Sequence, residues 1–278
     1  MSVPTRLGPP SGRSPADILR AITERRRRRL AAAGGSLAPP TVAPRALQAP
    51  PRTAADNPFV AALAARRGAA VIAEVKLGSP RLGRLGARVD PERLARTYAA
   101  AGAAALSVVV EPDFFYGDYE LLRRCRAASG LPAIAKDFVV DLLQLEWARA
   151  AGADAVLLIA ALYRREELLA WAAAARRLGL APLVETHDPA DLAQLAGADW
   201  ELVGFNSRDL RTFAVDLGYS VEIGPRLPAG ALKVAESGIG SRADLERLAA
   251  AGFDAFLVGE SLLLADDPAA KLRELLGP

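Results

Sequence analysis

From residue 68 onward, short apolar runs alternate with longer segments in which apolar residues recur at helical spacing. The runs are rich in Val, Ile, Leu and Ala at successive positions, which is typical of strands buried on both faces. The eight candidate strands are Ala69–Val75, Ala104–Val109, Ala133–Lys136, Ala155–Ile159, Pro182–Glu185, Leu202–Asn206, Leu232–Glu236 and Ala255–Val258. Strands that alternate with helices in this way predict parallel βα units.

Glycine residues mark many junctions between these elements. Several of the helical stretches end beside a glycine, for example Gly102, Gly130 and Gly152, and glycine readily takes the left-handed conformation that ends helices. Eight such units predict a (β/α)8 TIM barrel of the α/β class, with an open doubly wound sheet as the alternative. The first strand is followed by Lys76–Ser79 and lacks the glycine-rich dinucleotide fingerprint of many open sheets, which favours the barrel.

Residues 1–52 precede the predicted barrel domain, residues 53–278, and differ from it in composition. We expect a flexible N-terminus rich in Pro, Ser and Gly, then a basic amphipathic helix over Ala16–Ala33 and a proline-rich connector over Gly34–Pro51. A short helix over Phe59–Arg67 should then lead into the barrel.

The net charge of +3 is distributed unevenly along the chain. Residues 1–52 hold ten arginines against two acidic residues, so the remaining residues carry a net charge of −5. The run Arg25–Arg29 could contact nucleic acid or a membrane surface. The apolar spacing of Ile18, Leu19 and Ile22 instead favours the solvated face of an amphipathic helix, and no aromatic residues interleave the arginines to stack on bases. We therefore expect no nucleic-acid partner and no membrane partner.

Cys125 is the only cysteine among the 278 residues. A lone thiol forms neither an internal disulfide nor a cysteine metal site, so we expect a reducing, cytoplasmic location. No apolar run approaches the roughly 20 residues that span a bilayer, and the N-terminus lacks the apolar core of a signal peptide. These features predict a soluble protein in which Cys125 packs within a helix.

Polar residues gather at the predicted carboxyl ends of the strands, which form the functional face of a barrel. They are Glu74, Lys76, Lys136, Asp137, Glu185, Asn206, Ser207, Arg208, Glu236, Ser237 and Glu260. Because burying an unpaired charge costs several kcal/mol, these groups should be either paired or functional. His187 also follows the fifth strand, and this interpretation places it on the outer rim rather than among the functional groups.

Lysine is rare in this chain, with only four lysines among 35 basic residues. Two of them, Lys76 and Lys136, occupy strand ends, where an ammonium that can lose its proton has a use that arginine cannot serve. Structural pairing with Glu74 and Asp137 is the alternative. If the two lysines are neighbours and partly buried, the proton affinity of each should fall.

Two glycine-containing segments, Glu236–Ile239 and Val258–Ser261, follow the last two strands. Small residues there let backbone N–H groups point at an anion, and barrels commonly bind phosphate between these loops. We therefore expect a small phosphorylated substrate, with two tight glycine turns as the alternative. Phe114 and Phe115, after the second strand, either line a pocket for an aromatic ring or cover the barrel mouth.

Seven motifs, in order along the chain, resemble the indole-3-glycerol-phosphate synthase family. They are Ile72–Lys76 with Ser79-Pro80, Phe114–Gly117, Lys136–Phe138, Leu183–Glu185, Gly204–Leu210, Ala235–Ile239 and Val258–Leu262. The helix at Ile18–Leu30 resembles the family's extra N-terminal segment, so the resemblance covers essentially residues 16–276.

The resemblance implies a carboxy-lyase of tryptophan biosynthesis that converts 1-(2-carboxyphenylamino)-1-deoxyribulose 5-phosphate to indole-3-glycerol phosphate without cofactor or metal. It makes Lys136 the general acid of ring closure and assigns Glu185 and Lys76 to dehydration, with the division of steps between the two lysines left open. Glu74, Asn206 and Glu236 would hold these groups and the substrate hydroxyls in place. The remaining implied substrate contacts are Phe115, Phe138, Leu157 and Leu210 for the ring, Arg208 for the carboxylate, Ser237, Gly238, Gly259 and Glu260 for the phosphate, and Ser79 in the first loop.

The sequence departs from the family in its first loop, where Leu77 stands in place of a basic residue and Arg81 in place of a serine. This departure bears on loop closure and phosphate contact, and so on rate or substrate tolerance. Three alternatives are a diverged paralogue serving secondary metabolism, an isomerase of a phosphorylated sugar derivative, and an inactive scaffold. The paired lysines argue against the isomerase, and the intact acid–base set argues against the scaffold. We expect a monomer or a weak homodimer.

Overall fold

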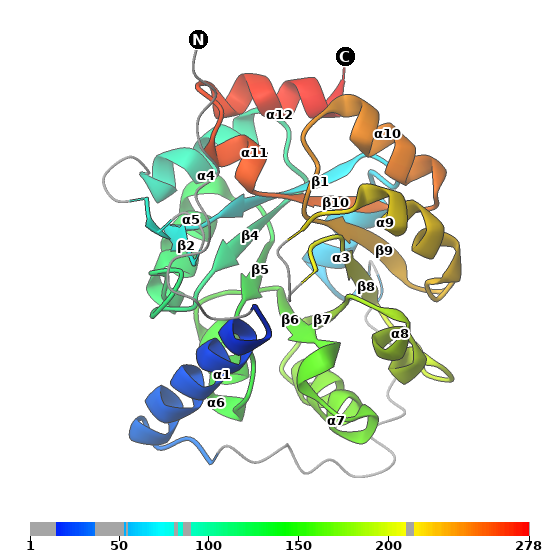
Figure 1. Cartoon of the computed structure of the whole chain (residues 1–278). Coiled ribbons are helices and arrows are strands. Elements are labelled where there is room, and N and C mark those ends of the chain that lie inside the picture. Colours follow the sequence, from blue (N-terminus) through cyan, green and yellow to red (C-terminus); the bar gives the residue numbers. More distant parts are fainter. Residues whose placement is uncertain are drawn as a thin grey trace.

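The computed structural model describes residues 15–36, 53, 55–80, 83–85, 90–209 and 214–277. Within them, eight parallel strands close into a barrel in the order β1-β10-β9-β8-β7-β6-β5-β4 (Figure 1). The strands are β1 (Ala70–Val75), β4 (Ala105–Val109), β5 (Ala133–Lys136), β6 (Ala155–Ile159), β7 (Ala181–Thr186), β8 (Leu202–Asn206), β9 (Leu232–Glu236) and β10 (Ala255–Val258). Because β1 pairs with both β4 and β10, the sheet has no edge, which confirms the barrel and excludes the open sheet.

Helices surround the strands and alternate with them along the chain (Figure 1). They are α1 (Pro15–Ala32), α3 (Pro58–Ala64), α4 (Pro91–Ala100), α5 (Tyr119–Ser129), α6 (Leu142–Ala150), α7 (Arg165–Arg177), α8 (Pro189–Leu195), α9 (Leu217–Ile223), α10 (Arg242–Ala250), α11 (Glu260–Leu263) and α12 (Pro268–Leu276), with short 3-10 turns η2 (Ala160–Leu162) and η3 (Gly224–Arg226). A two-residue hairpin, β2 (Gly78–Ser79) with β3 (Gly83–Arg84), lies outside the barrel. None of the helices among the described residues is long and apolar enough to cross a bilayer.

Helix boundaries follow from local chemistry. Asp90, Asp118 and Asp188 each accept a hydrogen bond from a backbone N–H in the first turn of the following helix, which satisfies a donor that the helix itself leaves free. Gly130 ends α5 in the left-handed conformation, with φ of 70°, as the sequence predicts. The strand expectations are correct to within one residue at each end.

The apolar core has two layers. An outer layer packs the helices against the strands, and an inner layer fills the barrel with side chains such as Ile72, Leu183 and Leu257. Phe59 and Leu63 of α3 are fully buried in the inner layer, so α3 packs against the barrel interior. Burial of each such side chain contributes about 1.5–3 kcal/mol. The interior is therefore a packed core, and polar groups can gather only where it ends.

The expected N-terminal helix is present as α1, one residue earlier than the Ala16–Ala33 predicted. The expected flexible N-terminus and the proline-rich connector lie outside the described residues, apart from Pro15 and Gly34–Ser36. The helix predicted over Phe59–Arg67 ends earlier, at Ala64.

Candidate active site

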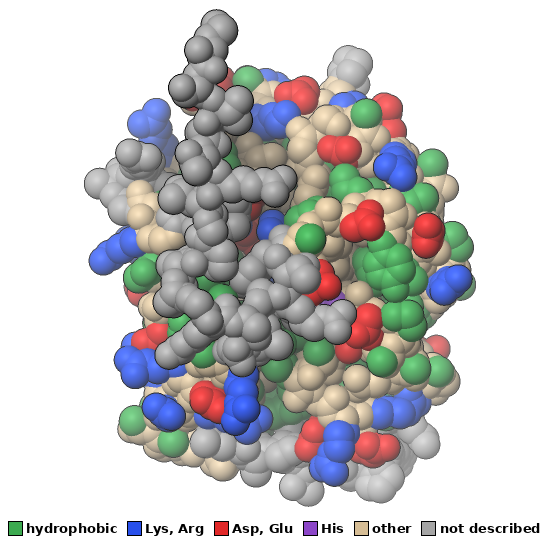
Figure 2. Space-filling model, viewed as in Figure 1, with side chains coloured by type: hydrophobic (Ala, Val, Ile, Leu, Met, Phe, Trp, Pro, Cys, Tyr) green, Lys and Arg blue, Asp and Glu red, His purple; other side chains and the backbone are tan. Residues whose placement is uncertain are grey.

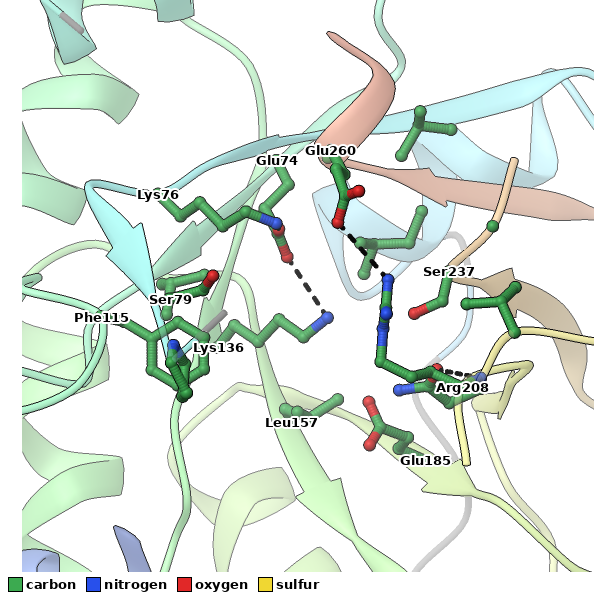
Figure 3. Close-up of a pocket in the computed structure, with 18 of the residues that line it drawn as sticks. Glu74, Lys76, Ser79, Phe115, Lys136, Leu157, Glu185, Arg208, Ser237 and Glu260 are labelled. Carbon is green, nitrogen blue, oxygen red and sulfur yellow. Dashed lines mark hydrogen bonds and ion pairs between the residues drawn. The ribbon is translucent and has the colours of Figure 1, made fainter. Parts of the chain in front are cut away.

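A cavity of about 520 Å³ lies at the carboxyl ends of the barrel strands (Figure 3). Its wall includes side chains from β1, β5, β6, β7 and β8, and from the loops that follow β9 and β10. The described Lys and Arg side chains visible in Figure 2 are interspersed with acidic ones and do not gather into one patch. Charged side chains instead gather inside the cavity.

Lys136, at the end of β5, is surrounded by carboxylates. Its Nζ lies 3.3 Å from Glu74 Oε2 and 3.3 Å from Glu236 Oε2. The second lysine, Lys76, donates from Nζ to Glu74 Oε1 at 2.7 Å. Glu74 therefore bridges both ammonium groups, as Figure 3 shows. Of the two pairings considered as the alternative, that of Lys76 with Glu74 is present, whereas Asp137 is bonded elsewhere.

Two glycines leave the space that these carboxylates occupy. A Cβ atom on Gly204 of β8 would collide with Glu236 Oε1, and one on Gly259 would collide with Glu74 Oε1. Any larger residue at either position would displace a carboxylate that contacts Lys136. The sequence signal for this requirement is a glycine inside or directly after an apolar strand.

The charges of this cluster stabilise one another. Burial alone would raise the pKa of Glu74, but the Lys76 and Lys136 ammonium groups outweigh it and lower that pKa to about 2. Burial would lower the pKa of Lys136, but the carboxylates of Glu74, Glu236 and Glu185 raise it instead. The expectation that a neighbouring lysine and burial would lower the proton affinity of Lys136 was therefore wrong, because carboxylates dominate its surroundings.

Glu185 and Glu236 form a coupled pair of buried carboxyl groups. Burial and the neighbouring Glu185 carboxylate raise the pKa of Glu236. Burial opposes ionisation of Glu185 as well, but His187, Lys136 and Glu236 together lower its pKa. Of this pair, Glu185 is therefore the group whose ionised form its surroundings favour, because His187 and Lys136 lower its pKa.

His187 does not lie on the outer rim, which corrects the sequence interpretation. Its side chain is 10% exposed, and Nε2 lies 3.1 Å from Glu185 Oε1. Side chains two residues apart on a strand point to the same side, so His187 points to the side of Glu185. This alternation is the sequence signal that could have placed it.

One wall of the cavity is apolar. It includes Phe115, Phe138 and Leu157, and the two phenylalanine rings lie 6.1 Å apart, tilted by 35°. The buried Glu111 carboxylate positions the Phe115 loop by accepting the backbone N–H of Phe115 at 3.0 Å, together with those of the two preceding residues. Phe115 therefore lines the pocket, whereas Phe114 is not among its lining residues.

The opposite wall suits an anion. Ser237 and Gly238 both take positive φ, 67° and 77°, and a Cβ atom on Gly238 would collide with Val215. Gly259 precedes the first turn of α11. The Arg208 guanidinium lies beside them, with Nη2 3.5 Å from Glu260 Oε2. The expected tight turns are present, and the phosphate site at them stays a prediction.

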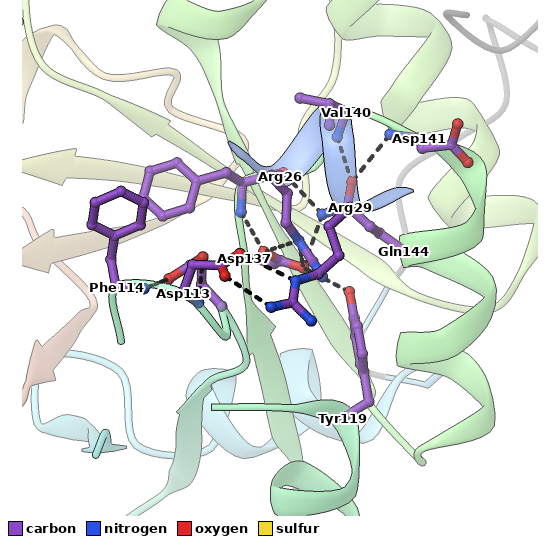
Figure 4. A network of polar contacts seen from close by, with 11 residues as sticks. Arg26, Arg29, Asp113, Phe114, Tyr119, Asp137, Val140, Asp141 and Gln144 are labelled. Carbon is purple, nitrogen blue, oxygen red and sulfur yellow. Dashed lines mark hydrogen bonds and ion pairs between the residues drawn. The ribbon is translucent and has the colours of Figure 1, made fainter. Parts of the chain in front are cut away.

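Helix α1 contributes to the site in a way that the sequence interpretation missed. Ile18, Leu19 and Ile22 line the cavity, so its apolar stripe faces the barrel mouth. The arginine run was expected to be solvated, but Arg26 is only 2% exposed. Its Nε donates to Asp137 Oδ1 at 3.1 Å, and its Nη2 also donates to Asp137 (Figure 4).

Asp137 directly follows Lys136 and is the centre of a buried network (Figure 4). Besides Arg26, it accepts hydrogen bonds from Tyr119 Oη and Gln144 Nε2, each at 2.8 Å. It also accepts the backbone N–H of Phe138 at 2.9 Å. Three helices, α1, α5 and α6, are thereby fixed to the turn that follows Lys136.

Arg26→Met should lower the free energy of unfolding by about 3 kcal/mol, because it leaves a buried carboxylate without its counter-charge. Arg28→Met is the matched control, since Arg28 is exposed on the same helix, and it should change that free energy by less than about 0.5 kcal/mol. Urea unfolding of both variants measures the difference. Equal losses of unfolding free energy in the two variants would mean that the Arg26–Asp137 pair stabilises the fold no more than an exposed arginine does.

The expected site residues come together at this one face. Those that line the cavity are Glu74, Lys76, Ser79, Phe115, Lys136, Phe138, Leu157, Glu185, Asn206, Arg208, Ser237, Gly238, Gly259 and Glu260. Glu236 is fully buried beside it and reaches Lys136. Leu210 lies outside the described residues, so its position stays a prediction.

Comparison with known proteins gives consistent matches along the chain. The profile of the family described as "Indole-3-glycerol phosphate synthase" matches residues 19–275. A protein of that name from Koribacter versatilis (strain Ellin345) is 46% identical over 213 residues, which are 77% of this chain and 82% of the relative. Another from Burkholderia vietnamiensis (strain G4 / LMG 22486) is 46% identical over 220 residues, 78% of this chain and 84% of the relative.

Solved structures show the same fold at low sequence identity. A thiamine phosphate pyrophosphorylase from Pyrococcus furiosus superposes with a TM-score of 0.56 at 16% identity, over 76% of this chain and 95% of the other. An orotidine 5'-phosphate decarboxylase from Pyrococcus horikoshii OT3 gives 0.55 at 16% identity, over 75% of this chain and the whole of the other. At this identity the likeness concerns the fold alone.

Proposed function

We propose roles for the residues of this site on the premise that the chain belongs to the indole-3-glycerol phosphate synthase family, as its match over residues 19–275 and its relatives at 46% identity show. The protein is therefore a carboxy-lyase of tryptophan biosynthesis. Its reaction closes the ring of 1-(2-carboxyphenylamino)-1-deoxyribulose 5-phosphate and releases carbon dioxide and water to give indole-3-glycerol phosphate.

The observation that carries the assignment of roles is the position of Lys136. Its ammonium lies 3.3 Å from both Glu74 and Glu236 at the mouth of a cavity with one apolar and one anion-accepting wall. During ring closure, the aromatic carbon attacks the ribulose carbonyl and negative charge develops on the carbonyl oxygen. A fixed ammonium there stabilises that charge and donates a proton to it.

The high proton affinity of Lys136 is compatible with this role. The carboxylates keep the amine protonated at neutral pH, so the acid form is present before each turnover. The alkoxide that forms on ring closure is a much stronger base than an amine, and proton transfer to it is therefore favourable. Glu74 and Glu236 hold the ammonium in place.

The remaining groups complete the reaction. Arg208 suits the substrate carboxylate, since a guanidinium can bind a carboxylate in two-point fashion, until that carboxylate leaves as carbon dioxide. Loss of water then needs an acid at the departing hydroxyl and a base that removes a ring proton. We assign these roles to Lys76 and Glu185, with Asn206 positioning the hydroxyls.

The two walls of the cavity divide the rest of the substrate. Phe115, Phe138 and Leu157 pack against its aromatic ring, and Leu210 is proposed to join them. On the other side, Ser79, Ser237, Gly238, Gly259 and the backbone N–H of Glu260 contact the phosphate. The apolar wall excludes water from the ring, which strengthens the electrostatic interactions opposite it.

The loop that follows β1 departs from the family pattern at Leu77 and Arg81. Leu77 is partly buried against the outer core, so it anchors the loop by packing where a basic residue would interact by charge. Arg81 lies outside the described residues.

We propose further that the protein is cytoplasmic. We also propose that it is a monomer or weak homodimer, which sedimentation at several concentrations would test.

The function is tested by mixing the purified protein with the carboxyphenylamino-deoxyribulose phosphate and following indole fluorescence. The protein should be produced in a host that lacks this activity, so that no host enzyme contributes. A rise in fluorescence with release of carbon dioxide is the expected result. Absence of product at high enzyme concentration would refute the function.

A further inference from the structure

The single histidine of the chain lies between two carboxylates beside the cavity. On one side its Nε2 is 3.1 Å from Glu185 Oε1, and on the other its Nδ1 is 3.6 Å from Asp191 Oδ2. Both carboxylates are almost completely buried, with exposed fractions of 3% and 5%. The three side chains therefore form a row from Asp191 on α8, through His187, to Glu185 in the cavity wall.

Local structure fixes this row. Asp188 caps α8 by accepting the backbone N–H of Asp191 at 2.9 Å, and Asp191 in turn accepts the backbone N–H of His187 at 2.8 Å. Asp191 therefore stabilises the turn between β7 and α8 and presents its charge to the imidazole at the same time. Neither ring nitrogen forms a well-aligned hydrogen bond within the described residues, so the carboxylates act on the ring mainly as charges.

Three ionisable groups of the described part of the chain face the Glu185 carboxylate. Lys136 approaches from β5, the carboxyl of Glu236 from β9, and His187 from the end of its own strand. Lys136 contacts two other carboxyl groups directly, those of Glu74 and Glu236. Among the described residues, the imidazole is the cation at ion-pair distance from Glu185.

We infer that His187, held in its cationic form by Asp191, is a positioning residue that keeps the Glu185 carboxylate ionised and oriented for proton removal. The inference rests on the proposed function, because it assigns a helper to the base of that reaction. Burial would lower the pKa of His187, but the two carboxylates raise it to about 10. The imidazole would thus remain charged across the neutral range.

The sign of the pH effect follows from this arrangement. A neighbouring cation lowers the pKa of a carboxyl group, so the base form of Glu185 persists to lower pH. Removing the charge raises the pKa of Glu185. Activity, which needs the base form, should then fall at a higher pH than in the wild type.

His187→Gln keeps an amide donor near the position of Nε2 and removes the charge. The acid limb of the kcat/KM profile should move up by about one pH unit or more, with the alkaline limb unchanged and a loss that grows as the pH falls toward that limb. A uniform loss at every pH, without movement of the acid limb, would indicate a structural role and overturn the inference.

A second measurement uses the fact that the chain has one histidine. With ¹⁵N-labelled histidine, the ring nitrogens of the intact protein should give imidazolium shifts at pH 7 and titrate near pH 10. Asp191→Asn keeps an acceptor for the backbone and removes one charge, so the ring should titrate at least about one pH unit lower. Asp188→Asn is the matched control, because it removes the same charge from the same turn and asparagine also caps helices.

The outcomes separate the two proposals. A wild-type ring that titrates near its ordinary value of about 6.5, or equal shifts in Asp191→Asn and Asp188→Asn, would overturn the inference whether or not the enzyme is active. Failure of the wild type to convert the substrate would refute the proposed function instead. This second measurement needs no turnover, and it decides the case if His187→Gln does not fold.

Discussion

Lys136→Ala is expected to lower kcat by a factor on the order of 10² to 10⁴, while the substrate still binds. The loss follows from the position of the ammonium, 3.3 Å from each of two buried carboxylates at the cavity mouth. Without it, no cation is fixed where charge develops on the carbonyl oxygen. The assigned phosphate and ring contacts come from other residues, so KM should vary by less than about tenfold.

Lys136→Arg is the informative companion to this variant. Arginine keeps the positive charge and so satisfies Glu74 and Glu236, but it scarcely releases a proton. If proton donation matters, the arginine variant should remain at least about tenfold slower than the wild type. Stopped-flow fluorescence under single-turnover conditions measures the chemical step of both variants. Full activity of Lys136→Ala would remove Lys136 from its assigned role.

Glu185→Gln is expected to lower the rate of indole formation by roughly 10² or more. Glutamine has the size of glutamate, and the fully buried site would retain its packing, but an amide cannot take up the ring proton. Because ring closure and loss of carbon dioxide precede this step, an intermediate should accumulate. Mass spectrometry of quenched reactions should find the substrate mass reduced by carbon dioxide but not by water.

Glu222→Gln serves as the control for this variant, because Glu222 is exposed on α9 away from the cavity. It should leave rate and product distribution unchanged. If Glu185→Gln instead stops the reaction before carbon dioxide is released, Glu185 acts in ring closure rather than in dehydration. The role assigned to Glu185 in dehydration would then be wrong, but Glu185 would still belong to the active site.

The barrel and most of its site could be read from the chain. Apolar runs separated by helical segments predict strands whose carboxyl ends share one face, because parallel strands connected by helices all point the same way. The rarity of lysine singled out Lys76 and Lys136 at that face. Glycines that follow strands marked the side of the cavity that we propose for the phosphate. None of these inferences required the contacts between side chains.

Where expectations failed, the missing information concerned neighbours that are distant in sequence. The solvated face expected for the arginine run was wrong for Arg26, whose partner Asp137 lies 111 residues away. The pKa of Lys136 is raised rather than lowered as expected, because the carboxylates of Glu74 and Glu236 approach it from other strands. His187 was misplaced for a different reason, since strand alternation was not applied beyond Glu185.

The sequence by itself determined which strands and helices form and which residues reach the carboxyl face, because these depend on periodicity and local capping. Only the tertiary structure decided the direction in which the pKa values of Glu74, Lys136 and His187 shift and the position of α1 over the cavity. Electrostatic energy depends on distances of a few ångström and on burial. Those quantities arise when the closed barrel brings Glu74, Lys136 and Glu236 together, and no local pattern of residues encodes them.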